Sequence, residues 1–312
     1  MRFEQTVEVV SPEFPCGSAW LANCLFESGV PAWHLWGYDT RNEWTEQQAG
    51  RFQYSAGWLP WRQTLASLTP GRIFDFRRGI EARFSHEWPW QVALNRRIVL
   101  VVRDPRDALY SEWRRHRRNL QLSASVDFPS FLRQPFFGGP ICVVDALWLH
   151  LRSWLIYRNA LPAKFLLLRF EDWKREPVGE LRRVCAWLGI QIENGDLERA
   201  VAASDVRKLL SIEDALVAAK PDAPRYNRRG RAEEWRTAWQ PEWMLEMGRH
   251  WDPVIAALGY EPLPAGRNVE PAFDIVRVLA WRGLSDPVRV NVWRELLQSD
   301  DRFVTGCALM GW

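Results

Sequence analysis

Lysine is almost absent from this sequence. Of the 41 lysines and arginines in the 312-residue chain, only Lys164, Lys174, Lys208 and Lys220 are lysines. A Walker A loop, G-x-x-x-x-G-K-[ST], needs a lysine, and none of these four stands in one. The sequence therefore argues against a kinase-like phosphotransferase. The use of arginine in place of lysine along the whole chain is most simply explained by codon bias.

Cysteine is also scarce, and its spacing has no metal signature. The chain has no C-x-x-C pair and no cysteine–histidine cluster with metal-ligand spacing; its five cysteines are Cys16, Cys24, Cys142, Cys185 and Cys307. An odd, scattered set predicts reduced thiols. The sequence lacks both a signal-peptide pattern and an apolar run of about 18 residues. We therefore expect a cytoplasmic protein that contacts no membrane and requires no metal.

An excess of charge is missing as well. The net charge of +3 does not indicate a nucleic-acid-binding protein. Two arginine-rich stretches, Arg114–Arg118 and Arg228–Arg231, keep one alternative open, a basic module that binds heparin or nucleic acid. What the chain does have is a 47% hydrophobic fraction, enough for a sizeable core, and 20 tryptophans.

Short apolar runs alternate with helical patterns along the chain. Thr6–Ser11, Arg97–Val102 and Lys164–Phe170 are predicted strands, and a helix is predicted over 105–118 with proline in its first turn. This alternation predicts an α/β fold with a largely parallel sheet, whose loops 12–17 and 103–105 lie at one edge. Further helices are predicted at 145–159, 177–188, 195–203 and 240–258, strands at 73–76 and 83–86, and mainly loops at 32–70 and 119–140.

The turn at Pro12–Trp20 is a candidate anion site. It leads into a predicted helix, whose first N–H groups and positive end attract anions. Ser18 is placed to cap this helix and to donate to a phosphate oxygen. A plain strand-to-helix turn explains the segment about equally well.

Two arginine-bearing segments are candidates for the same chemistry. Arg103 ends a predicted buried strand and Ser111 lies two turns into the next helix, so the two could hold one phosphate. The alternative for Arg103 is a salt bridge to Asp104, Asp107 or a neighbouring loop acid. Arg228–Arg236 (RRGRAEEWR) sets three arginines around a glycine, which suits an anion, although a disordered basic loop has the same composition.

His86 is the best-placed candidate for a general base. It ends the predicted strand 83–86, on the same face as Phe84, and histidine titrates near neutral pH. A lone histidine more often has a structural role.

Taken together, these segments resemble the sulfotransferases that use 3′-phosphoadenosine 5′-phosphosulfate, of the cytosolic and bacterial small-molecule type. Phe14–Leu21 (FPCGSAWL) is similar to P-K-S-G-T-T-W-L, and Arg103–Ser111 (RDPRDALYS) to R-N-P-K-D-x-x-x-S. Arg228–Arg236 resembles R-K-G-x-x-G-D-W-K, and Phe170–Pro177 (FEDWKREP) resembles Y-E-D-L-K-x-x-P. Ser85–His86 resembles a Thr-His pair. The five segments follow in the family's order.

The resemblance implies a P-loop-kinase-like domain over residues 1–264 with a central parallel sheet flanked by helices, followed by a helical C-terminal extension over 265–312. It implies the phosphosulfate donor as cofactor, with 3′,5′-adenosine bisphosphate as product. Backbone N–H groups would hold the 5′-phosphosulfate, from Cys16, Gly17, Ser18 and Ala19. Trp20 would stack on adenine, and His86 would be the catalytic base. The 3′-phosphate would be held by Arg103, Ser111, Arg228, Arg229 and Gly230.

The sequence also departs from the family pattern. Pro15 replaces the loop lysine, Phe84 replaces a second lysine, and Glu233 replaces a glycine. Losing one charge donor from such a site costs about 10²–10³ in rate. Three alternatives follow. The chain is a weak or non-catalytic nucleotide-binding member, or the register of the match slips, or an arginine reaches in from elsewhere, the candidates being Arg2, Arg77, Arg78 and Arg83.

Aromatic residues indicate the acceptor. Flat aromatic walls favour an aromatic or hydrophobic small molecule that accepts through a hydroxyl or an amine, whereas aromatic rings that only fill a core would say nothing of the acceptor. The candidate wall residues are Trp33, Trp36, Trp44, Trp58, Trp61, Trp88, Trp90, Phe136 and Phe137. Residues 265–312 either cap this site or form the surface of a homodimer.

Overall fold

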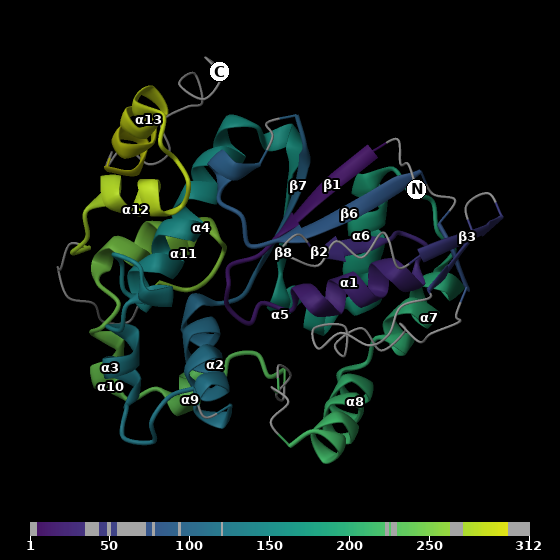
Figure 1. Cartoon of the computed structure of the whole chain (residues 1–312), viewed down its shortest axis with the longest axis horizontal. Helices are drawn as coiled ribbons and strands as arrows, with labels where there is room; N and C mark the ends of the chain where they lie inside the picture. The colour runs from purple at the N-terminus through teal and green to yellow at the C-terminus, as the bar shows by residue number, and fades with distance from the viewer. Residues whose placement is uncertain are drawn as a thin grey trace.

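A five-stranded parallel sheet is the centre of the fold, in the order β2-β6-β1-β7-β8 (Figure 1). The structure is a computed structural model, and it describes residues 5–34, 44–48, 51–54, 73–76, 79–92, 95–119, 121–221, 225, 230–262 and 271–298. The strands of the sheet are β1 (Gln5–Val10), β2 (Ala32–His34), β6 (Ile80–Ser85), β7 (Arg97–Val102) and β8 (Phe165–Arg169).

The most apolar run of the sequence lies inside this sheet. Ile98 to Val102 of β7 are all buried, as expected for a strand covered on both faces. β1 pairs with β6 and β7 in parallel, with Val10 opposite both Ser85 and Leu100. Because all these strands run the same way, the segments that follow them meet at one edge, as the sequence predicts.

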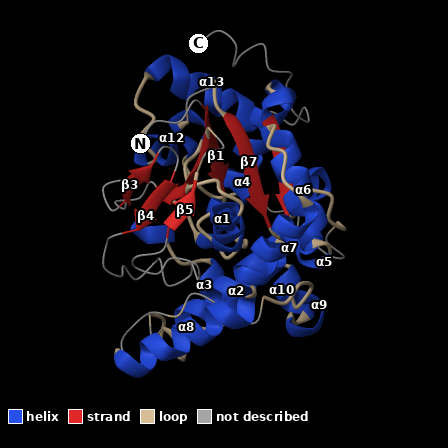
Figure 2. Cartoon of the chain, turned by 90° about the vertical axis from the view of Figure 1, so that its right-hand side faces the viewer, coloured by secondary structure: helices blue, strands red, loops and turns tan. Residues whose placement is uncertain are grey.

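Helices cover the sheet and continue beyond it. The predicted helix at 105–118 is confirmed as α2 (Pro105–Arg118), and the Asp104 side chain caps it by accepting from the N–H of Arg106. The other helices up to residue 219 are α1 (Ser18–Glu27), α3 (Phe128–Leu132), α4 (Val143–Ala160), α5 (Phe170–Arg175), α6 (Pro177–Leu188), α7 (Asn194–Ala203) and α8 (Val206–Ala219). Figure 2 shows α8 extending away from the sheet.

Four parts of the predicted pattern are wrong. The expected loop at 119–140 contains the short helix α3. The helix expected over 240–258 is broken into α10 (Pro241–Met244), a 3-10 turn, and α11 (Asp252–Ala257), because Gly248 takes an extended conformation between them. Residues 206–219 form α8, which was not predicted. The expected loop at 32–70 begins with β2 and contains β3 (Trp44–Gln48) and β4 (Arg51–Tyr54), which join β5 (Ile73–Asp75) in an antiparallel sheet (Figure 2).

The last described helices pack against the body of the molecule. After α9 (Trp235–Ala238), α10 and α11 come α12 (Ile275–Trp281) and α13 (Pro287–Gln298). α13 lies beside α4, and α12 packs against α13 (Figure 1). Trp293 of α13 is buried, with its ring centroid 5.1 Å from that of Trp90. Among the described helices, none is both long enough and apolar enough to cross a membrane.

Candidate active site

The turn after β1 is shaped around one glycine. Gly17 has φ 85° and precedes α1 as its N-cap residue, and a Cβ there would lie 2.7 Å from Cδ2 of Phe170. Glycine is therefore required twice, by the left-handed conformation and by the ring against it. Ser18 is the first helical residue, and no side chain caps α1, so the expectation that Ser18 caps it is wrong. The N–H of Trp20 donates to the carbonyl of Gly17 at 3.1 Å. The N–H groups of Ser18 and Ala19, at the start of α1, precede the first intrahelical bonds and are donors at the sheet edge.

His86 follows β6 directly, beside this turn. Its Nδ1 lies 2.9 Å from the carbonyl oxygen of Ser11, and the N–H of Ser11 donates to the carbonyl of Ser85 at 3.1 Å. A carbonyl only accepts, so Nδ1 carries the proton, and the neutral ring has its lone pair on Nε2. The end of β1 thus fixes the tautomer that a general base needs.

A second histidine, His150 of α4, is buried close to His86. Its Nε2 is 3.2 Å from the carbonyl oxygen of Glu87, and the ring stands edge-on to Trp88. Burial, with the positive charge of Arg282, lowers the pKa of His150 to about 3. A base that weak is poorly suited to proton removal near neutral pH, which leaves His86 as the stronger candidate.

Arg103 joins three segments at the end of β7. Its guanidinium is buried, donates to the carbonyls of Pro15 and Arg231, and lies 3.5 Å from Oδ2 of Asp107. The salt bridge to Asp107, which the sequence left open as an alternative role for Arg103, is therefore present. Among the described residues, however, Nε of Arg103 has no acceptor, which leaves one buried, charged donor unused.

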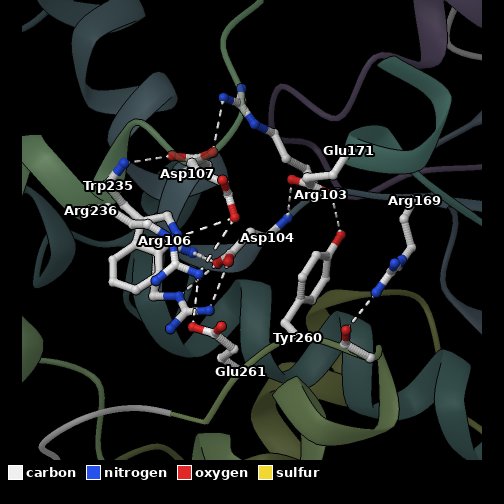
Figure 3. A network of polar contacts seen from close by, with 12 residues as sticks. Arg103, Asp104, Arg106, Asp107, Arg169, Glu171, Trp235, Arg236, Tyr260 and Glu261 are labelled. Carbon is white, nitrogen blue, oxygen red and sulfur yellow. Dashed lines mark hydrogen bonds and ion pairs between the residues drawn. The ribbon is translucent and has the colours of Figure 1, made fainter. Parts of the chain in front are cut away.

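A polar network fixes the start of α2 against the later segments (Figure 3). Asp107 accepts from the N–H of Trp235 at 2.8 Å. Glu171 accepts from the N–H of Asp104 at 3.1 Å and from the hydroxyl of Tyr260 at 2.6 Å. Burial raises the pKa of Asp107 and of Glu171. These bonds bring the Arg228–Arg236 segment, as far as it is described, to the Arg103–Ser111 segment.

Phe170 is a site residue that sequence reasoning missed. Its Cδ2 and Cε2 atoms lie against the Cβ position of Gly17, and the adjacent Cζ lies 4.0 Å from that of Gly230. The Arg103 guanidinium stacks 4.9 Å from the ring centroid. The signal was present, because Phe170 stands at the tyrosine position of the Y-E-D segment. Arg228 and Arg229 lie outside the described residues.

The remaining predicted cofactor residues occupy the same edge with different exposure. Ser111 is buried on α2 and lies on the same helix face as Asp107, four residues earlier. Burial raises the pKa of the Cys16 thiol to about 12, so the side chain stays a neutral, buried thiol and does not act as a thiolate. Trp20 is half-buried beside Ala19, and its ring centroid lies 5.1 Å from that of Trp173, edge to face.

The structure does not bring any of the described candidate arginines into the place of the missing loop lysine. Arg83 is 3.5 Å from the carboxylate of Glu8, within the sheet, and Arg2, Arg77 and Arg78 lie outside the described residues. An unexpected arginine reaches the turn instead. Arg282, after α12, holds both carboxylate oxygens of Glu13, at 3.0 and 3.4 Å.

The aromatic residues near this turn are mostly buried. Trp88 is 1% exposed, Trp90 and Phe136 are 7% exposed, and only Phe137 projects, at 65%. Phe136 stacks on Phe14 with ring centroids 5.4 Å apart. These buried rings support the core more directly than they line a pocket. Trp36, Trp58 and Trp61 lie outside the described residues, as do the side chains of Trp33 and Trp44.

Glu233 carries backbone strain at the position where the family pattern has glycine. Its φ of 58° is left-handed, and its side chain is exposed. We predict that Glu233→Gly raises the free energy of unfolding by about 0.5–1 kcal/mol, because relief of strain exceeds the added flexibility of the unfolded chain. Chemical denaturation measures this. Glu234→Gly is the control, since Glu234 has φ −62° and should lose stability on the same change; a loss in both variants would contradict the prediction.

The fold and the site together define an α/β protein that gathers anion donors at the carboxyl edge of its sheet. A sequence profile described as the sulfotransferase domain matches residues 84–258, more than half of the chain. The chain therefore belongs to the sulfotransferase domain family.

Individual relatives are distant. Cytosolic sulfotransferase 3 of Arabidopsis thaliana is 23% identical over 154 residues, 47% of this chain and 49% of that protein. Sulfotransferase 2A1 of Rattus norvegicus is 30% identical over 105 residues, 33% of this chain and 34% of that protein. The chain thus spans about half or less of the length of these relatives.

A structural relative confirms the fold. The mouse sulfotransferase SULT7A1, solved in complex with PAP, superposes with a TM-score of 0.52 at 19% identity, over 82% of this chain and 84% of that chain. The predicted α/β, P-loop-like class with a central parallel sheet is therefore confirmed.

Proposed function

We propose that this protein transfers a sulfuryl group from 3′-phosphoadenosine 5′-phosphosulfate to a small-molecule acceptor. One observation carries the proposal: the segments after β1, β6, β7 and β8 meet at a single edge. They bring together the Gly17 turn, His86, Arg103 and the Phe170 ring. Family membership supplies the reaction class, and the named solved relative was crystallised with PAP.

The residues present fit the nucleotide. The Gly17 turn offers helix N–H donors, Arg103 has an unused buried Nε, and Gly230 leaves room for close approach. We assign the 5′-phosphosulfate to the backbone of Cys16–Ala19. We assign the 3′-phosphate to Arg103, Ser111 and Gly230, together with Arg228 and Arg229, which directly precede Gly230 in the sequence. Trp20, with a buried Nε1 that no described residue accepts from, is the adenine contact.

His86 supplies the proton step. When bound, the donor provides an activated sulfuryl group on a phosphate leaving group. The neutral His86 ring would accept the proton of the acceptor hydroxyl or amine at Nε2, while Nδ1–H stays bonded to the Ser11 carbonyl. The N–H groups of the Gly17 turn would stabilise charge that develops on the leaving oxygen.

The acceptor is assigned by its class alone. We propose a hydrophobic or aromatic small molecule, because Phe137 projects beside the stacked Phe14 and Phe136 rings. Residues 1–264 are proposed as the sulfotransferase domain and residues 265–312 as a helical extension of it. A nucleotide-binding member without activity is the second candidate, and it is favoured by one observation: Pro15 carries no charge where the family loop has lysine.

A thermal-shift panel tests the nucleotide assignment. We expect 3′,5′-adenosine bisphosphate, at about 100 times its dissociation constant, to stabilise the wild type by about 2.7 kcal/mol, with smaller shifts for AMP and ATP. Arg103→Ala should lose the selective shift, because it removes the central buried donor. No shift of the wild type with the bisphosphate would overturn the proposal.

A matched variant separates binding from folding. Arg97 lies at the opposite end of β7 and stacks on Trp187, so Arg97→Ala should keep the shift. Arg103→Ala is expected to have a lower melting temperature without ligand. This does not contradict the nucleotide assignment, because the measured quantity is the change in melting temperature that the ligand causes.

A further inference from the structure

Lys174 stands at the candidate site although lysine is almost absent from the chain. It lies one turn after Phe170 on α5, so both side chains leave the same helix face. Its Nζ is 3.7 Å from the Cβ position of Gly230, and Cζ of Phe170 is 4.0 Å from the same position. The ammonium group and the ring therefore converge on one turn, the described start of the Gly230 segment.

The contact with Gly230 tells which end of the site Lys174 serves. Cδ2 and Cε2 of Phe170 lie against the Gly17 turn, and the adjacent ring atom Cζ lies 4.0 Å from the Cβ position of Gly230. Nζ of Lys174 lies against Gly230, where Arg103 donates to the neighbouring carbonyl of Arg231. Its charge is thus added to the 3′-phosphate end and does not replace the lysine that Pro15 lacks at the 5′ end.

Positive charge outweighs negative charge around Lys174, which favours an anion there. Burial and the positive charge of Arg103 lower the pKa of Lys174, and Asp205 opposes this more weakly. Among the described residues, the buried Nε of Arg103 has no acceptor. Two cations whose charges act on each other are stabilised when an anion lies between them.

We propose that Lys174 binds the 3′-phosphate of the nucleotide together with Arg103. This inference rests on the proposed function. A lysine suits the position because its ammonium is a compact charge on a flexible stem, and the Lys174 side chain is exposed enough to move toward a ligand. The role is one of binding and of selectivity for nucleotides with a 3′-phosphate.

Calorimetric titration with 3′,5′-adenosine bisphosphate and with AMP tests this role. Lys174→Met should weaken the bisphosphate about tenfold, the effect of one charged hydrogen bond, and leave AMP within about twofold. Lys174→Arg should recover most of the affinity. Lys164→Met is the control, because Lys164 precedes β8 at the opposite edge of the sheet and should change neither ligand.

The outcomes separate the two proposals. A wild type that binds neither nucleotide overturns the proposed function. A wild type that prefers the bisphosphate while Lys174→Met retains the full preference overturns the role of Lys174 alone. Equal weakening of AMP and the bisphosphate also overturns it, since a 3′-phosphate ligand must discriminate between them. Circular dichroism of each variant confirms that the compared proteins are folded.

Discussion

Replacing His86 with asparagine is expected to lower turnover about 10²–10⁴-fold and to leave the affinity for 3′,5′-adenosine bisphosphate unchanged. The reason lies in the two ring nitrogens. Nδ1 donates to the carbonyl of Ser11, and asparagine can keep this bond with its amide N–H. It has no basic nitrogen to put where Nε2 stands, so only the proton transfer is removed.

The measurement is the rate of sulfuryl transfer from the phosphosulfate donor to a panel of phenols, alcohols and aromatic amines, together with bisphosphate affinity. His116→Asn is the control, since His116 pairs with Glu112 near the far end of α2. Unchanged turnover in His86→Asn would remove His86 from its role. A wild type that binds the bisphosphate but transfers to no acceptor would favour the non-catalytic alternative.

The parts of the fold that were predicted from sequence depend on local signals. Ile98 to Val102 of β7 form a continuous apolar run, and α2 begins at a proline after a capping aspartate. Each signal lies inside the element it specifies, so the boundaries of both were predicted to the residue. The common edge of the parallel strands follows from the same pattern, because right-handed crossovers fix the direction of every strand.

The parts that were missed depend on contacts between distant segments. Phe170 matters because its ring fills the space between Gly17 and Gly230, and no local pattern reports that distance. Arg282 is bonded to Glu13 across 269 positions of sequence. The long predicted helix at 240–258 had a suitable apolar period, but Gly248 and the proline in the first turn of α11 divide it.

The bond between Glu13 and Arg282 is the second site where a large effect is expected. The side chains are only 13% and 8% exposed, and both carboxylate oxygens are engaged. Arg282 also stacks on Trp281, 4.1 Å from the ring centroid. We predict that Arg282→Met or Glu13→Gln each lowers the free energy of unfolding by about 3–5 kcal/mol, because each leaves a buried polar partner without its match.

The double variant distinguishes a coupled pair from two separate contacts. Urea denaturation of the wild type, the two single variants and the double variant measures this. The double variant should lose much less stability than the sum of the single losses, because the second change removes the buried group that the first left without a partner. The pair Arg133–Glu246 is the control: its arginine is 52% exposed, and about 1 kcal/mol or less is expected from breaking it. Additive losses at Glu13 and Arg282 would contradict the coupling.

This pair also bears on what the last described helices do. Glu13 lies between Ser11, which contacts His86, and Gly17, the N-cap of α1 in the turn proposed to bind the phosphosulfate. Arg282 comes from beyond residue 258, where the family match ends. If the pair is worth several kcal/mol, then the α12–α13 segment holds the turn in its binding conformation, and the single variants should lose bisphosphate affinity along with stability. A destabilised Arg282→Met that still binds the bisphosphate at wild-type strength would instead confine the segment to supporting the core.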